Sequence, residues 1–291
     1  MNPSESAGVG LPMRSTYRPS IHLSGIYIYP IKSAAGIAVD FAAMTPRGLQ
    51  YDRRWMIASP DGKFMTQRQF PQMALIQIRI DHNALVLSAP KLNAAMSDLS
   101  LPLHPDPPQQ ESDLQTVEVW GDRCLAWSMG EDAAFWLSNV LNVPCQLVYM
   151  PDESDRPADH GAVGTEHQVS FADAYPYLLI SEASLADLNQ RLDAPIAMNR
   201  FRPNLVVSGC EAFAEDTWNA IRIGEQSFQV AKACSRCTVT TVDQATGERF
   251  AEPLKTLATY RYWDGKIWFG QNLIHQDLGT LSIGDSMIPR S

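Results

Sequence analysis

The residues best suited to chemistry in this sequence are two cysteines beside an arginine, in the run Cys234-Ser235-Arg236-Cys237. Valines and threonines on both sides of the run favour strand, and residues 243–247 supply turn residues, so the pattern predicts a β-hairpin. A thioredoxin-type redox pair would need its thiols at the start of a helix, and no helical period follows Cys237. We therefore expect the thiols on a strand.

Side chains alternate between the two faces of a strand, so Cys234 and Cys237 are expected to point in opposite directions. This geometry disfavours a shared metal ion. A structural zinc would also need further ligands, and Cys124, Cys145 and Cys210 do not stand at zinc-binding spacings. The pattern thus predicts one functional thiolate, with the other cysteine a small buried hydrophobe.

Basic residues at four chain breaks are a second candidate for chemistry. They are Lys32 beside Ser33, Arg53, Arg202 before Pro203-Asn204, and Arg236. In a chain with 23 basic and 32 acidic residues, such a set predicts a local anion pocket, because arginine can grip a phosphate with two hydrogen bonds. The alternative is that each is an ordinary solvated surface charge.

Composition limits the class of protein. With 291 residues and 45% hydrophobic content, the chain can form one large or two ordinary globular domains. The net charge of −9 argues against nucleic acid or an anionic membrane as the main partner. We expect no membrane span, since no apolar run approaches about 20 residues. Five scattered cysteines and no signal-peptide pattern predict the cytoplasm.

The first half of the chain is expected to position Lys32 and Arg53 on a β-rich scaffold. Strand patterns cover residues 23–39 with a break at 30–36, then 54–58, 75–80, 84–88 and 117–120. Apolar residues at helical spacing predict a helix from Glu131 to Leu141. Residues 102–113 contain four prolines and predict an exposed loop.

The stretch 151–164 is acidic and poor in apolar residues, which predicts a domain boundary. A serine N-cap and spaced leucines then predict a helix over residues 181–192. Strand patterns follow at 204–208, 220–223, 228–230, 266–269 and 281–285, which suggests a barrel or sandwich. We expect a disordered tail over 1–21 and two domains over 22–150 and 165–291.

Several motifs, taken in order, resemble the MOSC superfamily. They are Tyr29–Ser33, Asp52–Trp55, Leu179–Ser184, Asn199–Asn204, Glu215–Trp218, Cys234–Thr238 and Thr241–Asp243. The chain is most similar to the branch that holds the bacterial and mitochondrial amidoxime-reducing proteins, over nearly all of its length after residue 22. The resemblance implies a mixed α/β, mainly β fold, with an N-terminal β-barrel-like MOSC_N domain, a C-terminal MOSC β-barrel and a molybdenum cofactor between them.

The resemblance also implies roles for single residues. Cys237 falls on the position of the catalytic, molybdenum-ligating cysteine, and a soft thiolate suits a sulfur-rich metal centre. The implied cofactor-contacting residues are Lys32, Ser33, Arg53, Arg202, Asn204, Ser235 and Arg236. Binding of pyridoxal phosphate is a further implication. After Asp173, relatives often carry Thr-Ser where this chain has Ala174-Tyr175, so hydroxyl contacts are not expected there.

The implied function is a molybdenum-cofactor reductase of small N-hydroxylated substrates, namely hydroxylamino bases and amidoximes. The four-cysteine [2Fe-2S] pattern of some relatives and a G-x-G-x-x-G dinucleotide motif are both absent from this sequence, so we expect electrons from a separate ferredoxin-like or flavin reductase partner. Asp243 is a candidate general acid, although its position suits a turn. Two alternatives stay open: a sulfur carrier or sulfurtransferase with a persulfide on Cys237, and a cofactor-storing protein without catalysis.

Overall fold

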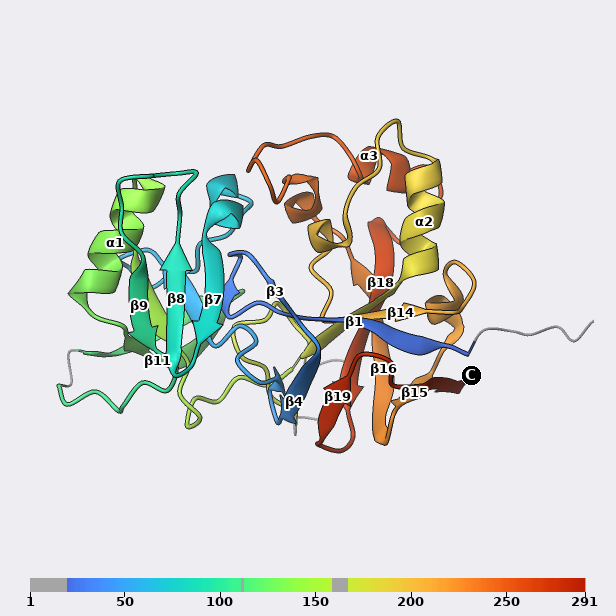
Figure 1. The fold of residues 1–291 in the computed structure, drawn as a ribbon, viewed down its shortest axis with the longest axis horizontal. Helices are drawn as coiled ribbons and strands as arrows, with labels where there is room; N and C mark the ends of the chain where they lie inside the picture. The colour runs from blue at the N-terminus through green and yellow to red at the C-terminus, as the bar shows by residue number, and fades with distance from the viewer. Residues whose placement is uncertain (1–19, 111–112, 159–166, 291) are drawn as a thin grey trace, which may run out of the picture.

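The structure is a computed structural model that describes residues 20–110, 113–158 and 167–290. The predicted disordered tail over 1–21 lies outside these residues except for Ser20 and Ile21. Figure 1 shows two lobes side by side, one built mainly from the first half of the chain and one mainly from the second half.

Four β-sheets form the scaffold of the part of the chain that the structure describes. A nine-stranded sheet runs through the second lobe in the order β20 (Met287–Arg290), β15 (Ala220–Ile223), β16 (Gln226–Ser235), β18 (Lys266–His275), β13 (Tyr177–Ser181), β14 (Leu205–Ser208), β1 (His22–Ile28) and β3 (Ile37–Val39), with β17 (Tyr262–Trp263) paired to β18. A five-stranded sheet has the order β10 (Leu114–Val119), β11 (Asp122–Ser128), β12 (Gln146–Tyr149), β6 (Trp55–Ala58) and β2 (Ile31–Lys32). Two three-stranded sheets contain β19 (Thr280–Ser282), β4 (Phe41–Thr45) and β5 (Gly48–Leu49), and β7 (Gln77–Asp81), β8 (Ala84–Ser88) and β9 (Leu99–Pro102).

The described helices are few and short. They are α1 (Glu131–Leu141), α2 (Glu182–Gln190) and α3 (Leu254–Leu257), with the 3-10 turns η1 (Pro71–Leu75), η3 (Met198–Arg200), η4 (Ala214–Thr217) and η5 (Thr238–Thr241). α1 buries one apolar face and ends at Asn142, which takes the left-handed conformation with φ 54°. α2 begins where Ser181 Oγ accepts a hydrogen bond from Ser184 N at 3.0 Å. Both predicted helices are thereby confirmed.

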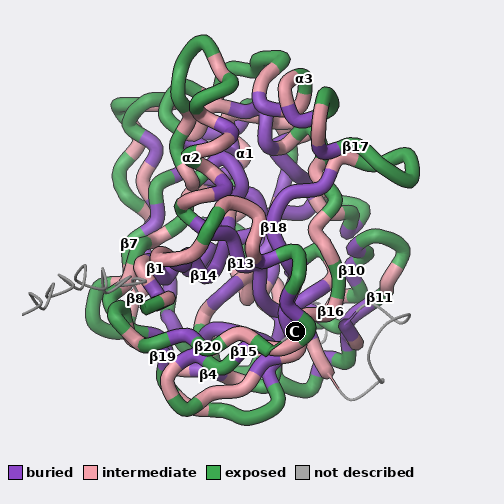
Figure 2. Tube along the Cα trace, turned by 90° about the vertical axis from the view of Figure 1, so that its right-hand side faces the viewer, coloured by how far each residue is buried: buried purple, intermediate pink, exposed green. Residues whose placement is uncertain are grey.

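The first strand of the chain belongs to the sheet of the second lobe. β1 pairs antiparallel with β14, from His22 opposite Ser208 to Ile26 opposite Leu205, and pairs on its other edge with β3. The core beneath this sheet therefore combines Leu23 and Ile26 with residues such as Phe228 from the other half of the sequence. Figure 2 shows the buried stretches of β13, β14 and β18 at the centre of the molecule.

The mainly β fold class is confirmed, but the sheets are open rather than closed barrels. The nine-stranded sheet has β20 and β3 at its edges, and the described strands form no ladder between them. Instead, Leu23 N donates to Asp285 O at 2.9 Å and Met287 N donates to Ile21 O at 2.8 Å. A bulge in β1 between Leu23 and Gly25 interrupts the register at this corner, so the sheet bends around its core without closing.

Two buried arginines hold the stretch at the predicted domain boundary. Arg156 is 2% exposed, pairs with Asp122 at 3.1 Å, and donates to the carbonyl oxygens of Ser170 at 2.7 Å and Ala172 at 2.5 Å. Arg47 donates to Val169 O at 3.1 Å from the other side of this stretch. These contacts fix the loop that leads to Asp173 against the first lobe.

Candidate functional site

A cavity of about 400 Å³ is lined by residues from both halves of the chain. All eight residues singled out from the sequence line it, namely Lys32, Ser33, Arg53, Arg202, Asn204, Ser235, Arg236 and Cys237. Six basic residues and one acidic residue are among the described residues at its wall. In a chain of net charge −9, this concentration of positive charge suits the cavity to an anionic ligand.

The two cysteines lie where β16 ends, and the predicted hairpin is wrong beyond that point. Cys234 is on β16, but Cys237 immediately precedes the 3-10 turn η5, where a second strand was expected. Arg200 explains the turn, because its buried guanidinium donates to the carbonyl oxygens of Thr240 at 2.9 Å and Thr241 at 3.0 Å. A charged donor set from elsewhere in the fold thus outweighs the strand preference of valine and threonine.

The expected opposite orientation of the two thiols is also wrong, since both cysteines line the cavity. The chain leaves the regular strand after Ser235, so strand alternation no longer applies at Cys237. Each sulfur still has its own arginine: Arg68 Nη1 donates to Cys237 Sγ at 3.3 Å, and Arg236 Nη1 donates to Cys234 Sγ at 3.0 Å. Cys237 is exposed to the cavity, whereas Cys234 is only partly buried rather than the buried hydrophobe expected.

Tyr29 is the platform for two of the predicted arginines. The guanidinium carbons of Arg53 and Arg202 lie 4.4 and 4.2 Å from the centre of its ring, and its hydroxyl donates to Pro203 O at 3.0 Å. Burial raises the pKa of Tyr29 even though both arginines oppose the shift, so the phenol stays neutral. Burial also lowers the pKa of Arg202 to about 10, which leaves it charged at neutral pH.

Asn204 fixes the position of Arg53 from the side. Its Oδ1 accepts from Arg53 Nη1 at 2.9 Å and from Leu178 N at 3.3 Å, and its Nδ2 donates to Tyr27 O at 3.1 Å. Arg53 also forms an ion pair with the buried Asp52. Asn204 is 1% exposed, so its role in this structure is to orient the arginine at the cavity wall.

Lys32 and Asp173 form an ion pair at the cavity. Lys32 is 4% exposed and donates to Phe171 O at 2.8 Å; burial lowers its pKa to about 8 although Asp173 opposes the shift. Although the Asp173 side chain is largely exposed, desolvation by the surrounding protein acts to raise its pKa; the Lys32 charge and hydrogen bonds from Lys32 and Trp120 outweigh this and hold the pKa below its ordinary value. Trp120 Nε1 donates to Asp173 Oδ1 at 3.1 Å.

Backbone strain is concentrated at this cavity. Four of its lining residues other than glycine have positive φ: Ser33 at 68°, Arg53 at 51°, Trp120 at 57° and Arg202 at 55°. Such conformations are uncommon for residues with a side chain, and they gather where a fold holds functional groups in place. The strain therefore supports a binding role for the predicted residues Ser33, Arg53 and Arg202.

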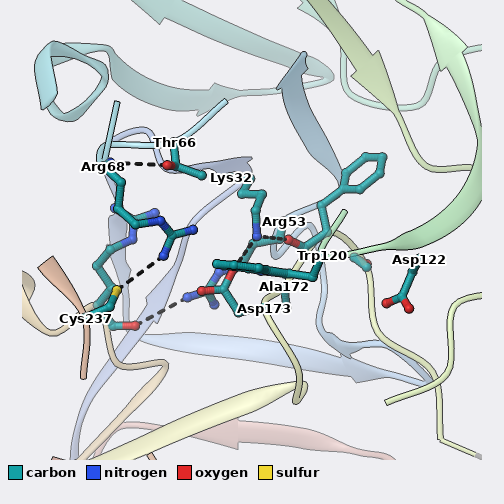
Figure 3. A network of polar contacts seen from close by, with 12 residues as sticks. Lys32, Arg53, Thr66, Arg68, Trp120, Asp122, Ala172, Asp173 and Cys237 are labelled. Carbon is teal, nitrogen blue, oxygen red and sulfur yellow. Dashed lines mark hydrogen bonds and ion pairs between the residues drawn. The ribbon is translucent and has the colours of Figure 1, made fainter. Parts of the chain in front are cut away.

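Two residues that sequence reasoning missed complete the site. Arg68 contacts Cys237 and lies with its guanidinium carbon 4.3 Å from the ring centre of Trp120. Figure 3 shows these side chains, with Lys32, Arg53 and Asp173, converging from both halves of the chain. Neither residue lies at a motif or at a proline break of the kind that marked the other cations.

Asp243 is a structural residue here. It pairs with Arg200 at 3.2 Å, and its Oδ1 accepts from Ala245 N at 2.8 Å and Thr246 N at 3.0 Å. It does not belong to the described lining of the cavity. The turn interpretation of this residue therefore holds, and the structure does not bring it to the site as a general acid.

Arg236 leaves a donor unused. Its Nη2 donates to Phe201 O at 2.7 Å, but its buried Nε has no hydrogen-bond partner among the described residues.

In the part of the chain that the structure describes, no group of three or more His, Cys, Asp and Glu side chains is placed to hold a metal ion. No described helix is both long enough and apolar enough to cross a membrane.

Family models match the two halves of the chain. The MOSC N-terminal beta barrel domain matches residues 20–144, and the MOSC domain matches residues 166–288. The chain belongs to the MOSC family. These two matches cover most of the sequence and include every residue that was predicted for the site.

Among MOSC relatives, this chain is 39% identical over 280 residues to mitochondrial amidoxime-reducing component 1 of Mus musculus. The aligned region covers 89% of this chain and 79% of the relative. It is 36% identical to the Homo sapiens protein of the same name, with coverage of 89% and 80%. Molybdenum cofactor sulfurase of Danio rerio is 35% identical over 93% of this chain, which spans 34% of that longer protein. The implied binding of pyridoxal phosphate gains no support from these comparisons or from the cavity.

Proposed function

We propose that this MOSC protein is an oxidoreductase that holds a molybdenum cofactor in the cavity and reduces N-hydroxylated compounds. The observation that carries the proposal is that Cys237 shares one cavity with six basic side chains in an acidic protein. The names of its amidoxime-reducing relatives, 36 to 39% identical over about nine-tenths of the chain, supply the reaction class.

The side chains at the cavity fit a phosphate-bearing pterin that carries a soft metal. Arg53 and Arg202 share the ring of Tyr29, and Arg236 lies at the wall of the same cavity. Lys32 and Ser33 would contact the cofactor from the first lobe, and Asn204 would act through Arg53. Cys237 offers an exposed thiol as the metal ligand.

When bound, the cofactor would supply two electrons to the N–OH group of the substrate. With two protons, the N–O bond would be replaced by an N–H bond and the oxygen would leave as water. The chain's own residues would bind the cofactor and position the groups around it. Arg68 holds the sulfur of Cys237 at the cavity. The hydrogen bonds of Arg156 to the backbone before Asp173 fix the loop that carries this residue. Lys32 keeps a proton on Nζ at neutral pH, because its lowered pKa of about 8 still lies above 7.

Replacing each cysteine separately tests the role of Cys237. We expect Cys237→Ala to lose molybdenum or activity, because it removes the metal ligand, and Cys234→Ala to keep most of both, because it removes only a partly buried side chain. Metal analysis, pterin fluorescence and circular dichroism of both variants measure this. Equal loss in the two variants, with folding intact, would defeat the proposal of a single ligand.

The electron source is a second test. We expect the purified chain to reduce benzamidoxime with reduced viologen but not with NADH alone. The sequence holds no G-x-G-x-x-G motif for a dinucleotide, so electrons would come from a separate donor protein, ferredoxin-like or a flavin reductase. Turnover of benzamidoxime with NADH by the isolated chain would contradict it.

A sulfur carrier with a persulfide on Cys237 is the second candidate. The exposed thiol beside Arg68 and the similarity to molybdenum cofactor sulfurases favour it. Molybdenum-free protein that accepts sulfur from a persulfide donor and passes it on would support this role over reduction. The cytoplasmic location stays a prediction, and the amidoxime-reducing relatives named above are called mitochondrial.

A further inference from the structure

Trp120 has a backbone conformation that is unusual for a large side chain. Val119 pairs with Asp122, so Trp120 and Gly121 form a two-residue hairpin loop, and both have positive φ, 57° and 92°. Such loops strongly favour asparagine, aspartate or glycine, and a bulky residue at positive φ is strained. The Trp120 ring lies 5.0 Å from the Phe64 ring, centre to centre, but the residue is 51% exposed, so packing offsets only part of that strain. A large, half-exposed aromatic ring at the cavity wall suggests contact with a ligand.

The indole lies close to the proposed metal ligand. The guanidinium carbon of Arg68 is 4.3 Å from the ring centre of Trp120, and Arg68 Nη1 is 3.3 Å from Cys237 Sγ. One guanidinium group therefore spans the space between the ring and the sulfur (Figure 3). A molecule resting on Trp120 would be held next to the centre where reduction is proposed to occur.

Asp173 adds a hydrogen-bond acceptor beside this ring. It is the single acidic residue among the described residues that line the cavity. Its Oδ1 accepts from Trp120 Nε1 and Lys32 Nζ, whereas its Oδ2 accepts no hydrogen bond from any described residue. The Asp173 side chain is 63% exposed, so Oδ2 can reach a ligand. Among many cations, this oxygen selects a ligand group that donates an N–H.

We propose that Trp120 and Asp173 form the substrate-recognition subsite, which takes planar, conjugated N-hydroxylated compounds that carry an N–H donor. The planar group stacks on Trp120, and the N–H donates to Asp173 Oδ2. Amidoximes and hydroxylamino-substituted bases have both features, whereas hydroxylamine has no planar group. This inference rests on the proposed reductase function and adds to it the basis of substrate choice.

The test compares benzamidoxime with hydroxylamine as substrates of the molybdenum-loaded protein, per bound molybdenum. In Trp120→Leu, the ratio of kcat/KM for benzamidoxime to that for hydroxylamine should fall about tenfold, since stacking a base on an aromatic side chain is worth roughly 1–3 kcal/mol. Trp120→Phe carries the same backbone strain but keeps a ring, so it should retain most of the ratio. Asp173→Asn should instead lower kcat/KM for both substrates, because hydroxylamine also carries an N–H donor. Phe135→Leu, at an exposed aromatic residue on α1, is the control that should leave the ratio unchanged.

Calorimetric titration of benzamidoxime without reductant separates this inference from the proposed function. Affinity should fall about tenfold in Trp120→Leu whether or not the protein turns over. If neither substrate is reduced but this difference in binding persists, the reductase function fails and the subsite stands. If both substrates lose activity equally in Trp120→Leu, or if Phe and Leu at this position behave alike, the subsite is wrong.

Discussion

Substitution of Tyr29 tests whether its aromatic ring holds Arg53 and Arg202 in place. The ring is 2% exposed, receives both guanidinium groups within 4.4 Å of its centre, and its hydroxyl makes one hydrogen bond to Pro203 O. Tyr29→Phe removes only that hydrogen bond. Tyr29→Leu removes it together with the aromatic face on which the two arginines lie, so the pair of variants separates the two contributions.

The expected sizes follow from these contacts. Loss of one buried hydrogen bond should lower the free energy of unfolding of Tyr29→Phe by about 1 kcal/mol. Two partly desolvated cation–π contacts contribute about 1 kcal/mol each, so Tyr29→Leu should lose about 3 kcal/mol in all. The arginines would no longer be held in place for a phosphate, and we expect pterin affinity to fall about tenfold in Tyr29→Leu and little in Tyr29→Phe.

Urea unfolding of the cofactor-free proteins and pterin titration monitored by fluorescence provide the two measurements. Tyr177 is a matched control, since it is buried at 1% exposure with its ring against Phe228 and no arginine over it among the described contacts. Tyr177→Leu should lose stability but keep pterin affinity. Equal pterin affinity of Tyr29→Leu and Tyr29→Phe would show that the aromatic ring does not hold the two arginines in place for a ligand.

Three further outcomes are expected from pH and from Asp243. Burial lowers the pKa of Lys32 from 10.5 to about 8, so cofactor affinity should fall as pH rises through 8. The free energy of unfolding should rise between pH 8 and 10.5, because the unfolded chain binds more protons than the folded chain in that range. Dialysis and urea titrations of Lys32→Met should show neither effect. Burial, with the nearby His167 acting in the same direction, lowers the pKa of His275 from 6.5 to about 4, so stability should fall as pH drops through this range, and His275→Asn should flatten that dependence in thermal melts. Asp243→Asn should lower stability by about 2 kcal/mol through loss of the Arg200 pair, yet leave turnover per molybdenum unchanged; a lower turnover would restore Asp243 as a general acid.

Regular elements with strong local patterns could be predicted from the sequence. The helix over Glu131–Leu141 matches its predicted bounds, and so does the strand over Ala220–Ile223. The turn after Cys237 could not be predicted, because the residue that stabilises it, Arg200, is about 40 positions away and its partners are backbone carbonyls. Local preference gives no signal for such a contact.

The candidate site shows the same division. Lys32, Arg53, Arg202 and Arg236 could be found because each stands at a break in a recognisable motif, and they do share one cavity. Trp120 and Arg68 could not, since a tryptophan in a hairpin loop and an arginine in an irregular segment have no distinctive spacing. Their importance follows from where the hairpin and the loop meet the cysteine segment in space.

The pairing of β1 with β14 has a consequence for synthesis on the ribosome. β1 leaves the exit tunnel about 180 residues before its partner, which at 5–20 residues per second is a delay of roughly 10 to 40 s. During that time its apolar residues Leu23 and Ile26 have no finished sheet to join. The cavity, whose walls include Lys32 and Cys237, therefore forms only after the strands of the second lobe have been synthesised, and the cofactor can be loaded only after that point.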